Sequence, residues 1–573
     1  MIARPTRALL GAATLTATLV LSPVARSQIV PTDPSGGCPI SPSTVAGMFQ
    51  SNTVTLNGVA KAADSTQPLT PNCGFFQWSE QMFLWLTSPA PATYGGGSRI
   101  MFSPQFFTVT PEGSDGRRTF LQNNARRPLS MLLRKTELGP HGLPALISRS
   151  GHVLEVAPPV RGRPVPPIIR LPSGAMVRLG SASRGPNGEL RLLDLHGAEV
   201  TPSRLNLPLI VHPRIEIEPG RPTAMVPAAA FNTAIQARKI IINHIPIFID
   251  PQGNVIDVEP GQADNGVLLS QNGSLIYYIT VTNDLYAYHR SMHGAAVIPP
   301  TTTLDFPLTA ADASAVVTFA ASKGHTILEP QALAVESKSS WIEASAVPNP
   351  GDYIQVKATV PTFNKSNPNN WVPNGQKVLK LVMVGIHVVG SANGHGEMVW
   401  ATFEHTANTP DASYSYTSTS GTKTVNQNTS GAWIFTPAGS SGPFNAMQAS
   451  WTGTAIVGTP VGPTTVLRTK PWGTDGTNTA LNTQVIAANA SIISQLVAGD
   501  VRKNYFQLGA TWTIFGAPPN GGNEVGTNEL ANSTIETFMQ AATPTGVGAN
   551  CFACHTSNTV TVSHIYPELK PLP

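Results

Sequence analysis

Residues 75–86 carry the clearest helical pattern in the chain. Bulky apolar side chains recur three, four and seven positions apart in Phe75-Phe76-Gln77-Trp78-Ser79-Glu80-Gln81-Met82-Phe83-Leu84-Trp85-Leu86. Positions with these separations lie on one face of an α-helix. The pattern predicts a buried helix, and we favour core packing of its aromatic rings over an aromatic electron path.

Two nearly continuous apolar runs predict strands that are buried on both faces. They are Val378–Val389 and Glu397–His405, with an expected turn at 391–396. Opposed residue numbers in a hairpin add up to a constant, so an even sum places His387 and His405 on one face and an odd sum separates them. On a shared face, these two histidines can converge with His395 and Glu397 on a metal ion or a haem iron. Hydrogen-bonded core packing is the alternative that we favour.

Weaker patterns complete the β-rich picture. The apolar runs on either side of Asn272-Gly273 predict a hairpin. Residues 407–445 are rich in Ser, Thr, Asn and Gly, which favours an exposed loop or mobile flap. Further on, we expect a helix over 480–501, a strand over 505–515 and a second helix over 528–542.

Together these patterns predict an α+β fold with a predominantly β-rich body and a smaller helical C-terminal region. Five regions follow: a signal peptide (1–27), an N-terminal segment with the aromatic helix (28–115), a basic Pro- and Gly-rich β insert (116–205), the β-rich body with the His387–His405 hairpin (206–470) and the C-terminal region (471–573). Thirteen Arg or Lys and only three Glu lie between Arg117 and Arg191. We favour a solvated surface over an acidic-partner site for this insert.

The N-terminal pattern predicts export. Arg4 and Arg7 precede an apolar run from Ala8 to Val24, and small residues follow up to Ser27. This arrangement is typical of a signal peptide that is cleaved near Ser27, which places the mature protein in the periplasm or outside the cell. No later apolar run approaches the roughly 20 residues of a membrane-spanning helix, so we expect no membrane span.

Charge gives no reason to expect a nucleic-acid partner. Loss of residues 1–27 removes three of the 36 basic side chains and no acidic one, which leaves 33 against 32. Charged residues make up only 12% of the chain, about half the usual share, whereas Gly (50) and Pro (52) are abundant. This composition favours a turn-rich secreted protein.

The four cysteines fall into two pairs. Cys38 and Cys73 lie near the mature N-terminus, and in an exported protein we favour a structural disulfide between them over free thiols. Closing a loop of that length stabilises the fold by roughly 3–4 kcal/mol. The second pair belongs to Cys551-Phe552-Ala553-Cys554-His555.

Cys-x-x-Cys-His is the pattern that attaches haem covalently in c-type cytochromes. Cys551 and Cys554 supply the thioethers, and His555 supplies the proximal axial ligand of the haem iron. Half of a zinc site and a redox dithiol are the alternatives, and the expected export favours haem. The sequence therefore predicts one covalent haem c, carried by the C-terminal region.

The sixth iron ligand has several candidates. Only 18 residues of the printed chain follow His555, and none is a methionine. His564, nine residues beyond His555, is within reach on chain length alone. Met539 lies on the expected helix over 528–542. His387, His395 and His405 are candidates for ligation or proton transfer, and a vacant sixth position is a further alternative.

Several motifs resemble a group of secreted bacterial proteins described as cytochrome c family proteins. They are Phe-Gln-Trp-x-x-x-x-Phe-Leu-Trp-Leu near Trp85, Gly385-Ile386-His387-Val388-Val389-Gly390 leading to His395, Val399-Trp400-Ala401-Thr402-Phe403-Glu404-His405, Leu530-Ala531-Asn532 and the Cys551–His555 motif. The resemblance covers most of the mature chain except the basic insert. It implies a haem c protein of unassigned reaction.

Three functions are compatible with these observations. The first is an exported monohaem c-type cytochrome that transfers single electrons to and from a redox partner protein. The second is a peroxidase- or oxidase-like haem enzyme with an open sixth iron site. The third is a β-rich binding or sensor protein with a structural haem. The large size of the chain counts against a plain electron carrier, and composition supplies no substrate or oligomeric state.

Overall fold

The computed structural model describes residues 30–69, 72–110, 117–123, 266–294, 306–446, 448–452, 455–540, 550–555 and 562–572, together with the backbone of short strands between 129 and 256. The expected signal peptide up to Ser27 and the side chains of most of the expected basic insert lie outside the described residues. Both therefore stay predictions.

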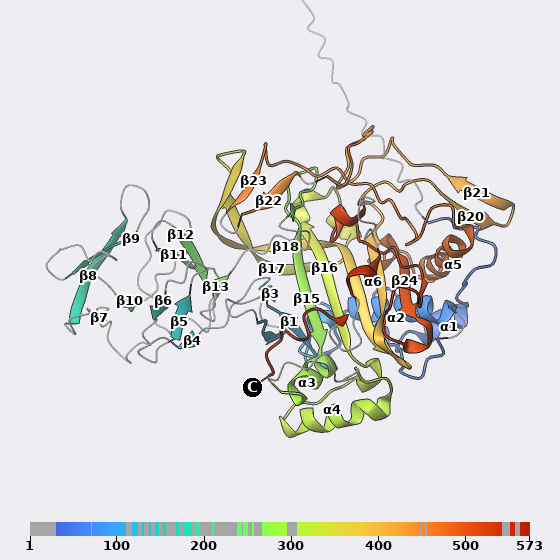
Figure 1. The fold of residues 1–573 in the computed structure, drawn as a ribbon, viewed down its shortest axis with the longest axis horizontal. Helices are drawn as coiled ribbons and strands as arrows, with labels where there is room; N and C mark the ends of the chain where they lie inside the picture. Colours follow the sequence, from blue (N-terminus) through green and yellow to red (C-terminus); the bar gives the residue numbers. More distant parts are fainter. Residues whose placement is uncertain are drawn as a thin grey trace, which may run out of the picture.

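Of the described strands, 13 form a single, mostly antiparallel sheet. These are β1 (Phe106–Val109), β2 (Phe120–Gln122), β3 (Leu129–Ser130), β14 (Gly266–Val267), β15 (Tyr277–Asn283), β16 (Val335–Glu343), β17 (Gln355–Asn364), β18 (Asn370–Ala392), β19 (His395–His405), β22 (Ala449–Trp451), β23 (Ile456–Gly458), β24 (Tyr505–Thr513) and β25 (Glu524–Gly526). Figure 1 shows this sheet curling through the centre of the molecule. It joins strands from the expected N-terminal segment, body and C-terminal region, and also β2 and β3 from the start of the expected insert.

The long strand β18 organises the sheet. Its first half pairs with β17 and β23, and its second half lies between β16 and β19. The predicted apolar run 378–389 lies inside this strand, and the second run forms β19, so both strands are confirmed. Asn393-Gly394 makes the tight turn between them, where Gly394 has φ +77°. Glycine adopts this left-handed conformation without a steric penalty, which favours it at the second position of the turn.

The register of this hairpin separates its histidines. His387 pairs with Thr402, so opposed residue numbers add up to an odd constant. Opposed residues share a face and neighbours alternate, which places His405 on the other side of the sheet from His387. The arrangement in which His387 and His405 share one face of the sheet is therefore excluded.

Helix α2 (Cys73–Thr87) covers one face of the sheet and confirms the predicted aromatic helix. The ring of Phe83 stacks on Phe403 of β19 with centroids 4.4 Å apart. Helix α5 (Thr479–Gln495) packs beside α2 and confirms the helix expected from residue 480, although it ends six residues early. Burial of the large aromatic side chains between helix and sheet accounts for the strong apolar pattern of α2.

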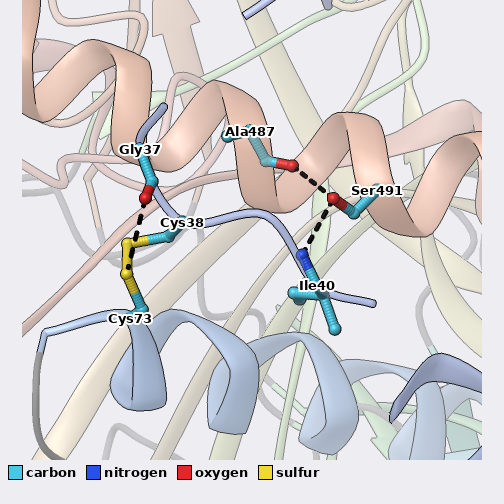
Figure 2. Close-up of a disulfide and its surroundings, with 6 residues drawn as sticks. All are labelled: Gly37, Cys38, Ile40, Cys73, Ala487 and Ser491. Atoms are coloured by element: carbon cyan, nitrogen blue, oxygen red, sulfur yellow. Dashed lines mark hydrogen bonds between the residues drawn. A yellow bond between two sulfur atoms is a disulfide. The ribbon is translucent and has the colours of Figure 1, made fainter. Parts of the chain in front are cut away.

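The predicted Cys38–Cys73 disulfide is confirmed and joins the chain before α1 (Pro42–Gly47) to the first turn of α2. Figure 2 shows the same N-terminal stretch lying along α5, where Ser491 Oγ accepts a hydrogen bond from the backbone N of Ile40 at 3.0 Å. The disulfide and this hydrogen bond together link the N-terminal stretch to α2 and to α5.

Helices α3 (Asp284–Met292) and α4 (Ala310–Ser322) pack against each other at one end of the sheet (Figure 1). The remaining described helices are the single turn α6 (Cys551–Cys554) and the short 3₁₀ turns η1 (Ala92–Tyr94), η2 (Ile100–Phe102), η5 (Pro330–Ala332), η6 (Ala344–Ala346), η7 (Pro350–Asp352), η8 (Val501–Asn504), η9 (Ile514–Gly516) and η10 (Thr537–Gln540). Three small sheets comprise β4 (Glu137–Leu138), β5 (Pro144–Ile147), β6 (Val153–Glu155) and β10 (Leu209–Ile210); β7 (Ile168–Arg170), β8 (Met176–Arg184) and β9 (Leu190–Asp194); and β11 (Arg238–Ile242), β12 (Ile245–Ile249) and β13 (Val255–Ile256).

Two predictions need correction. Residues 407–445 include a hairpin of β20 (Tyr414–Ser418) and β21 (Gly421–Val425), and Tyr414 and Tyr416 are buried, so this segment is not simply an exposed loop. β20 packs against α5, which buries these rings.

The prediction of a helix over 528–542 is wrong for residues 528–540, which the structure describes. Thr534 N donates to Asn532 Oδ1 at 2.9 Å, and Ser533 N donates to Glu404 Oε1 at 2.7 Å. These side-chain bonds compete with helical backbone bonds, and only η10 forms.

The described structure is thus β-rich with fewer helices, which agrees with the predicted α+β class at this coarse level. Among its helices, none combines the length and apolar character that crossing a membrane requires.

Candidate functional site

The Cys551–His555 motif begins with a single helical turn, α6 (Cys551–Cys554). Asn550 caps this turn, because its side chain accepts a hydrogen bond from Phe552 N at 2.9 Å. Phe552 is buried and anchors the turn, and both cysteines are free thiols. Residues three apart are neighbours on a helix surface, so Cys551 and Cys554 lie on the same side of the turn.

The environment of Cys551 disfavours its thiolate form. Burial, reinforced by the nearby Glu536 carboxylate, raises the pKa of Cys551 to about 12. A redox dithiol and a zinc site both use thiolates. Within the described ranges, no three His, Cys, Asp or Glu side chains are arranged to hold a metal ion. The raised pKa of Cys551 thus counts against a redox dithiol, and the described residues supply no zinc-binding group around the motif.

His555 is oriented by a backbone hydrogen bond. Its Nδ1 donates to the carbonyl oxygen of Val562 at 2.9 Å, so the lone pair lies on Nε2. Burial, followed by the neighbouring His564, lowers the pKa of His555 to about 4. The ring is therefore neutral at neutral pH. A neutral imidazole whose second nitrogen donates to a carbonyl is the usual state of a metal-ligating histidine.

Two rings contact His555. The ring of His564 lies 4.0 Å away between centroids at an interplanar angle of 18°, and that of Trp400 lies 4.2 Å away at 43°. Trp400 belongs to β19, and its Nε1 donates to Glu397 O at 3.1 Å. The structure thus brings His564, a predicted candidate, directly against His555.

His387 lies on the face of β18 that is turned away from α2 and pairs with Glu536. Its Nε2 lies 2.8 Å from Glu536 Oε2, and its Nδ1 lies 2.7 Å from Thr402 Oγ1. Burial by itself would raise the pKa of Glu536. The electrostatic attraction and the hydrogen bond of His387 outweigh burial, so the pKa of Glu536 lies below its ordinary value. Glu536 is therefore ionised at neutral pH.

The same hydrogen bonds engage both ring nitrogens of His387. The ionised Glu536 can only accept, so Nε2 carries a proton and donates it. Nδ1 lies against Thr402 Oγ1, which also lies 3.2 Å from Leu530 O. Both nitrogens therefore already have protein partners.

His395 and His405 lie elsewhere. His395 Nδ1 donates to Glu397 Oε1 at 2.8 Å, and its ring meets the edge of Phe75 in α2. His405 is fully buried, and its ring stacks on Tyr353 with centroids 3.8 Å apart. The structure therefore does not bring these two histidines together with His387. Each makes core contacts of its own, which is the alternative favoured from the sequence.

Met539 is half-buried in η10, three residues after Glu536 and with its backbone N bonded to Glu536 O at 2.9 Å. It therefore belongs to the segment that carries the His387 partner rather than to a long helix. Its candidacy as an iron ligand stays a prediction.

The sequence patterns did not single out Glu536. Thr402 and Trp400 were noted only as parts of the run 399–405. Glu536 lies in a segment that was expected to be helical, and it is 149 positions from its partner His387. The alternation along β19 does place Trp400 and Thr402 on one face, which was the available signal. Without the hairpin register and the path of the C-terminal segment, nothing linked these residues to His387 or His555.

The donor set fits a covalently attached haem. Two free thiols lie on one side of a helical turn, and the following histidine is neutral with Nδ1 engaged. These are the groups that thioether attachment and axial ligation require. No family model, curated protein or solved structure matches the chain.

Proposed function

We propose that this chain is an exported haem c protein that transfers single electrons. Cys551 and Cys554 would form the thioethers, and His555 would bind the iron through Nε2. The observation that carries the proposal is the hydrogen bond from His555 Nδ1 to Val562 O at 2.9 Å, next to two free thiols on one helical turn. It leaves the ligating nitrogen unprotonated before any iron is bound.

The surroundings of the motif support this function. When bound, haem c supplies reversible one-electron oxidation and reduction. Phe552 is buried and holds the attachment turn, and Trp400 lies against His555, so the ligand is fixed within apolar surroundings. Such a rigid ligand set lowers the structural rearrangement that accompanies electron transfer. The Cys38–Cys73 disulfide is compatible with the oxidising compartment in which haem c is attached.

The test is expression of the full chain in a bacterial host that attaches haem c during export. We expect the mass of one haem on the denatured protein and the optical spectrum of a two-thioether haem c. Cys551→Ala with Cys554→Ala should abolish the attachment. Cys38→Ser with Cys73→Ser is the matched control, since it also removes two cysteines but leaves the motif intact. A wild-type protein without covalent haem would refute the proposal.

A haem enzyme is the second candidate, and the His387–Glu536 pair favours it. The pair is largely buried and close enough to the motif to affect the pKa of both Cys551 and His555. A histidine whose Nε2 proton is held against a carboxylate can take part in proton transfer. Carbon monoxide separates the candidates: an open iron site binds it, whereas a six-coordinate low-spin haem does not, and the latter result would exclude this enzyme mechanism.

A further inference from the structure

We infer that residues 562–572, here called the anchored strap, position His555, and that His564 is a stacking partner on the side of His555 rather than the sixth iron ligand. The inference rests on the proposed attachment of haem. It follows from the ring geometry, the hydrogen bonds of His564 and the way in which the strap is held.

Ring geometry places His564 beside His555. An axial imidazole meets the iron with the edge that bears its ligating nitrogen, so two histidines on opposite sides of one iron cannot stack face to face. The rings of His555 and His564 do stack, with centroids 4.0 Å apart and planes 18° apart. A residue stacked on the face of the proximal ligand lies on the same side of the porphyrin as that ligand.

The hydrogen bonds of His564 agree with this placement. His564 Nε2 lies 3.2 Å from the carbonyl oxygen of Cys554, which can only accept, so this nitrogen carries a proton and donates it. The bond ties the ring to the backbone of the attachment motif itself. Together with the bond from His555 Nδ1 to Val562 O, it makes two reciprocal links between motif and strap.

The strap is held firmly by the rest of the fold. Ser563 Oγ lies 2.8 Å from Tyr286 Oη of α3 and also hydrogen bonds to Glu336 of β16. Arg290 Nε donates to Tyr566 O at 2.9 Å. Ser563 and Tyr566 are buried, so these bonds form away from solvent. The carbonyl of Val562 is therefore a fixed acceptor and can set the rotation of the His555 ring.

Trp400 completes the arrangement from the sheet. Its ring contacts His555, with centroids 4.2 Å apart, and its Nε1 is bonded to Glu397 O. His555 is thus restrained by a strand residue and by a strap residue. A ring restrained in this way would bind a haem iron in a defined orientation.

The experiment compares His564→Phe with His564→Ala in the haem-loaded full chain, using optical and EPR spectra and the reduction potential. His564→Phe retains a stacked ring but has no nitrogen, so we expect the spin state and carbon monoxide response of the wild type. His564→Ala should retain the haem but shift the reduction potential and broaden the EPR signals. Conversion of His564→Phe to a high-spin, carbon monoxide-binding haem, or an unchanged potential and EPR spectrum in His564→Ala, would overturn the inference.

A second measurement needs no haem and separates this inference from the proposed function. The protein can be expressed in the cytosol without its first 27 residues, so that no haem is attached. Nitrogen NMR of this protein should show a proton on Nδ1 of His555 and a proton on Nε2 of His564. The opposite tautomer at His555 would overturn the positioning role. Absence of covalent haem in the exported wild type, with both tautomers as expected, would refute the proposed function alone.

Discussion

At the scale of single residues, His387 shows how the partners of a side chain come from other parts of the chain. Its Nδ1 lies against Thr402 Oγ1 of the neighbouring strand, and its Nε2 lies against the carboxylate of Glu536, 149 positions away. The two side chains of the ion pair are 17% and 22% exposed. The exposure of this pair lies between that of a surface ion pair and that of a fully buried one. Removal of one partner therefore leaves the other in a poorly solvated position.

We predict that Glu536→Gln lowers the free energy of unfolding by about 2 kcal/mol at pH 7. The pKa of Glu536 is lower in the folded state than its ordinary value of 4.5, so its ionised form stabilises the fold above that pH. This contribution is lost as the pH falls through the folded-state pKa. The difference between variant and wild type should therefore shrink below about pH 4.5.

Denaturant unfolding as a function of pH measures this effect. Glu529→Gln is the control, because it removes one partner of the ion pair between Lys470 Nζ and Glu529 Oε1, 3.0 Å apart, whose side chains are 27% and 32% exposed. Glu529→Gln should lower the free energy of unfolding by less than Glu536→Gln does. An equal loss in the two variants at neutral pH would contradict a larger contribution of the His387–Glu536 pair.

At the scale of elements, the segment 530–536 lies on the sheet because β18 has a glycine beneath it. A Cβ added at Gly385 would meet Thr534 Oγ1 at 2.5 Å and Asn532 Oδ1 at 2.8 Å. The close approach lets Asn532 Nδ2 donate to Phe403 O at 3.2 Å and brings Glu536 to His387. A missing side chain in a strand therefore decides where the partner of His387 lies.

We predict that Gly385→Ala lowers the free energy of unfolding by about 1–3 kcal/mol and disturbs the His387–Glu536 pair. The added methyl group has no room unless the segment 530–536 moves. Gly47→Ala is the matched control, since a Cβ there meets nothing within 4 Å. Denaturant unfolding together with the NMR signals of the His387 ring measures both effects, and a neutral Gly385→Ala would contradict the close packing.

At the scale of the whole molecule, a buried charge network joins segments far apart in the chain. Arg468 is fully buried, and its guanidinium donates to Glu404 Oε2 at 2.8 Å and also to Asp411. Glu404 in turn accepts a hydrogen bond from Ser533 N. The network thus connects β19, the chain before β20 and the segment that carries Glu536.

We predict that Arg468→Met lowers the free energy of unfolding by roughly 3–5 kcal/mol at pH 7, because two buried carboxylates lose their cation. Burial already raises the pKa of Asp411 to about 6 against the opposing effect of Arg468. Without Arg468 the folded-state pKa rises further, so the stability of the variant should recover partly as the pH falls toward 5.

Lys423→Met provides the control for this prediction. It breaks the 2.5 Å ion pair between Lys423 and Asp33 on the surface, where exposed charges contribute little. Denaturant unfolding at pH 5 and 7 should show little change for Lys423→Met. If Arg468→Met is as stable as the wild type at both pH values, the charge network does not stabilise the fold and the prediction is wrong.

The sequence by itself determined the features that depend on local pattern or spacing. The apolar periodicity of 75–86 predicted α2, and the runs around His387 and His405 predicted β18 and β19. The pairing of Cys38 with Cys73 followed from cysteine usage in a chain that we expect to be exported. The Cys551–His555 motif predicts haem attachment from five adjacent residues, because the chemistry needs only those groups on one turn.

Only the tertiary structure decided which distant side chains meet. The strand pattern allows two registers, and backbone pairing selected the one that separates His387 from His405. Glu536 reaches His387 because Gly385 leaves space, and His564 reaches His555 because the strap is anchored on α3 and β16. Such contacts depend on packing across more than a hundred residues, and no periodicity along the chain encodes them.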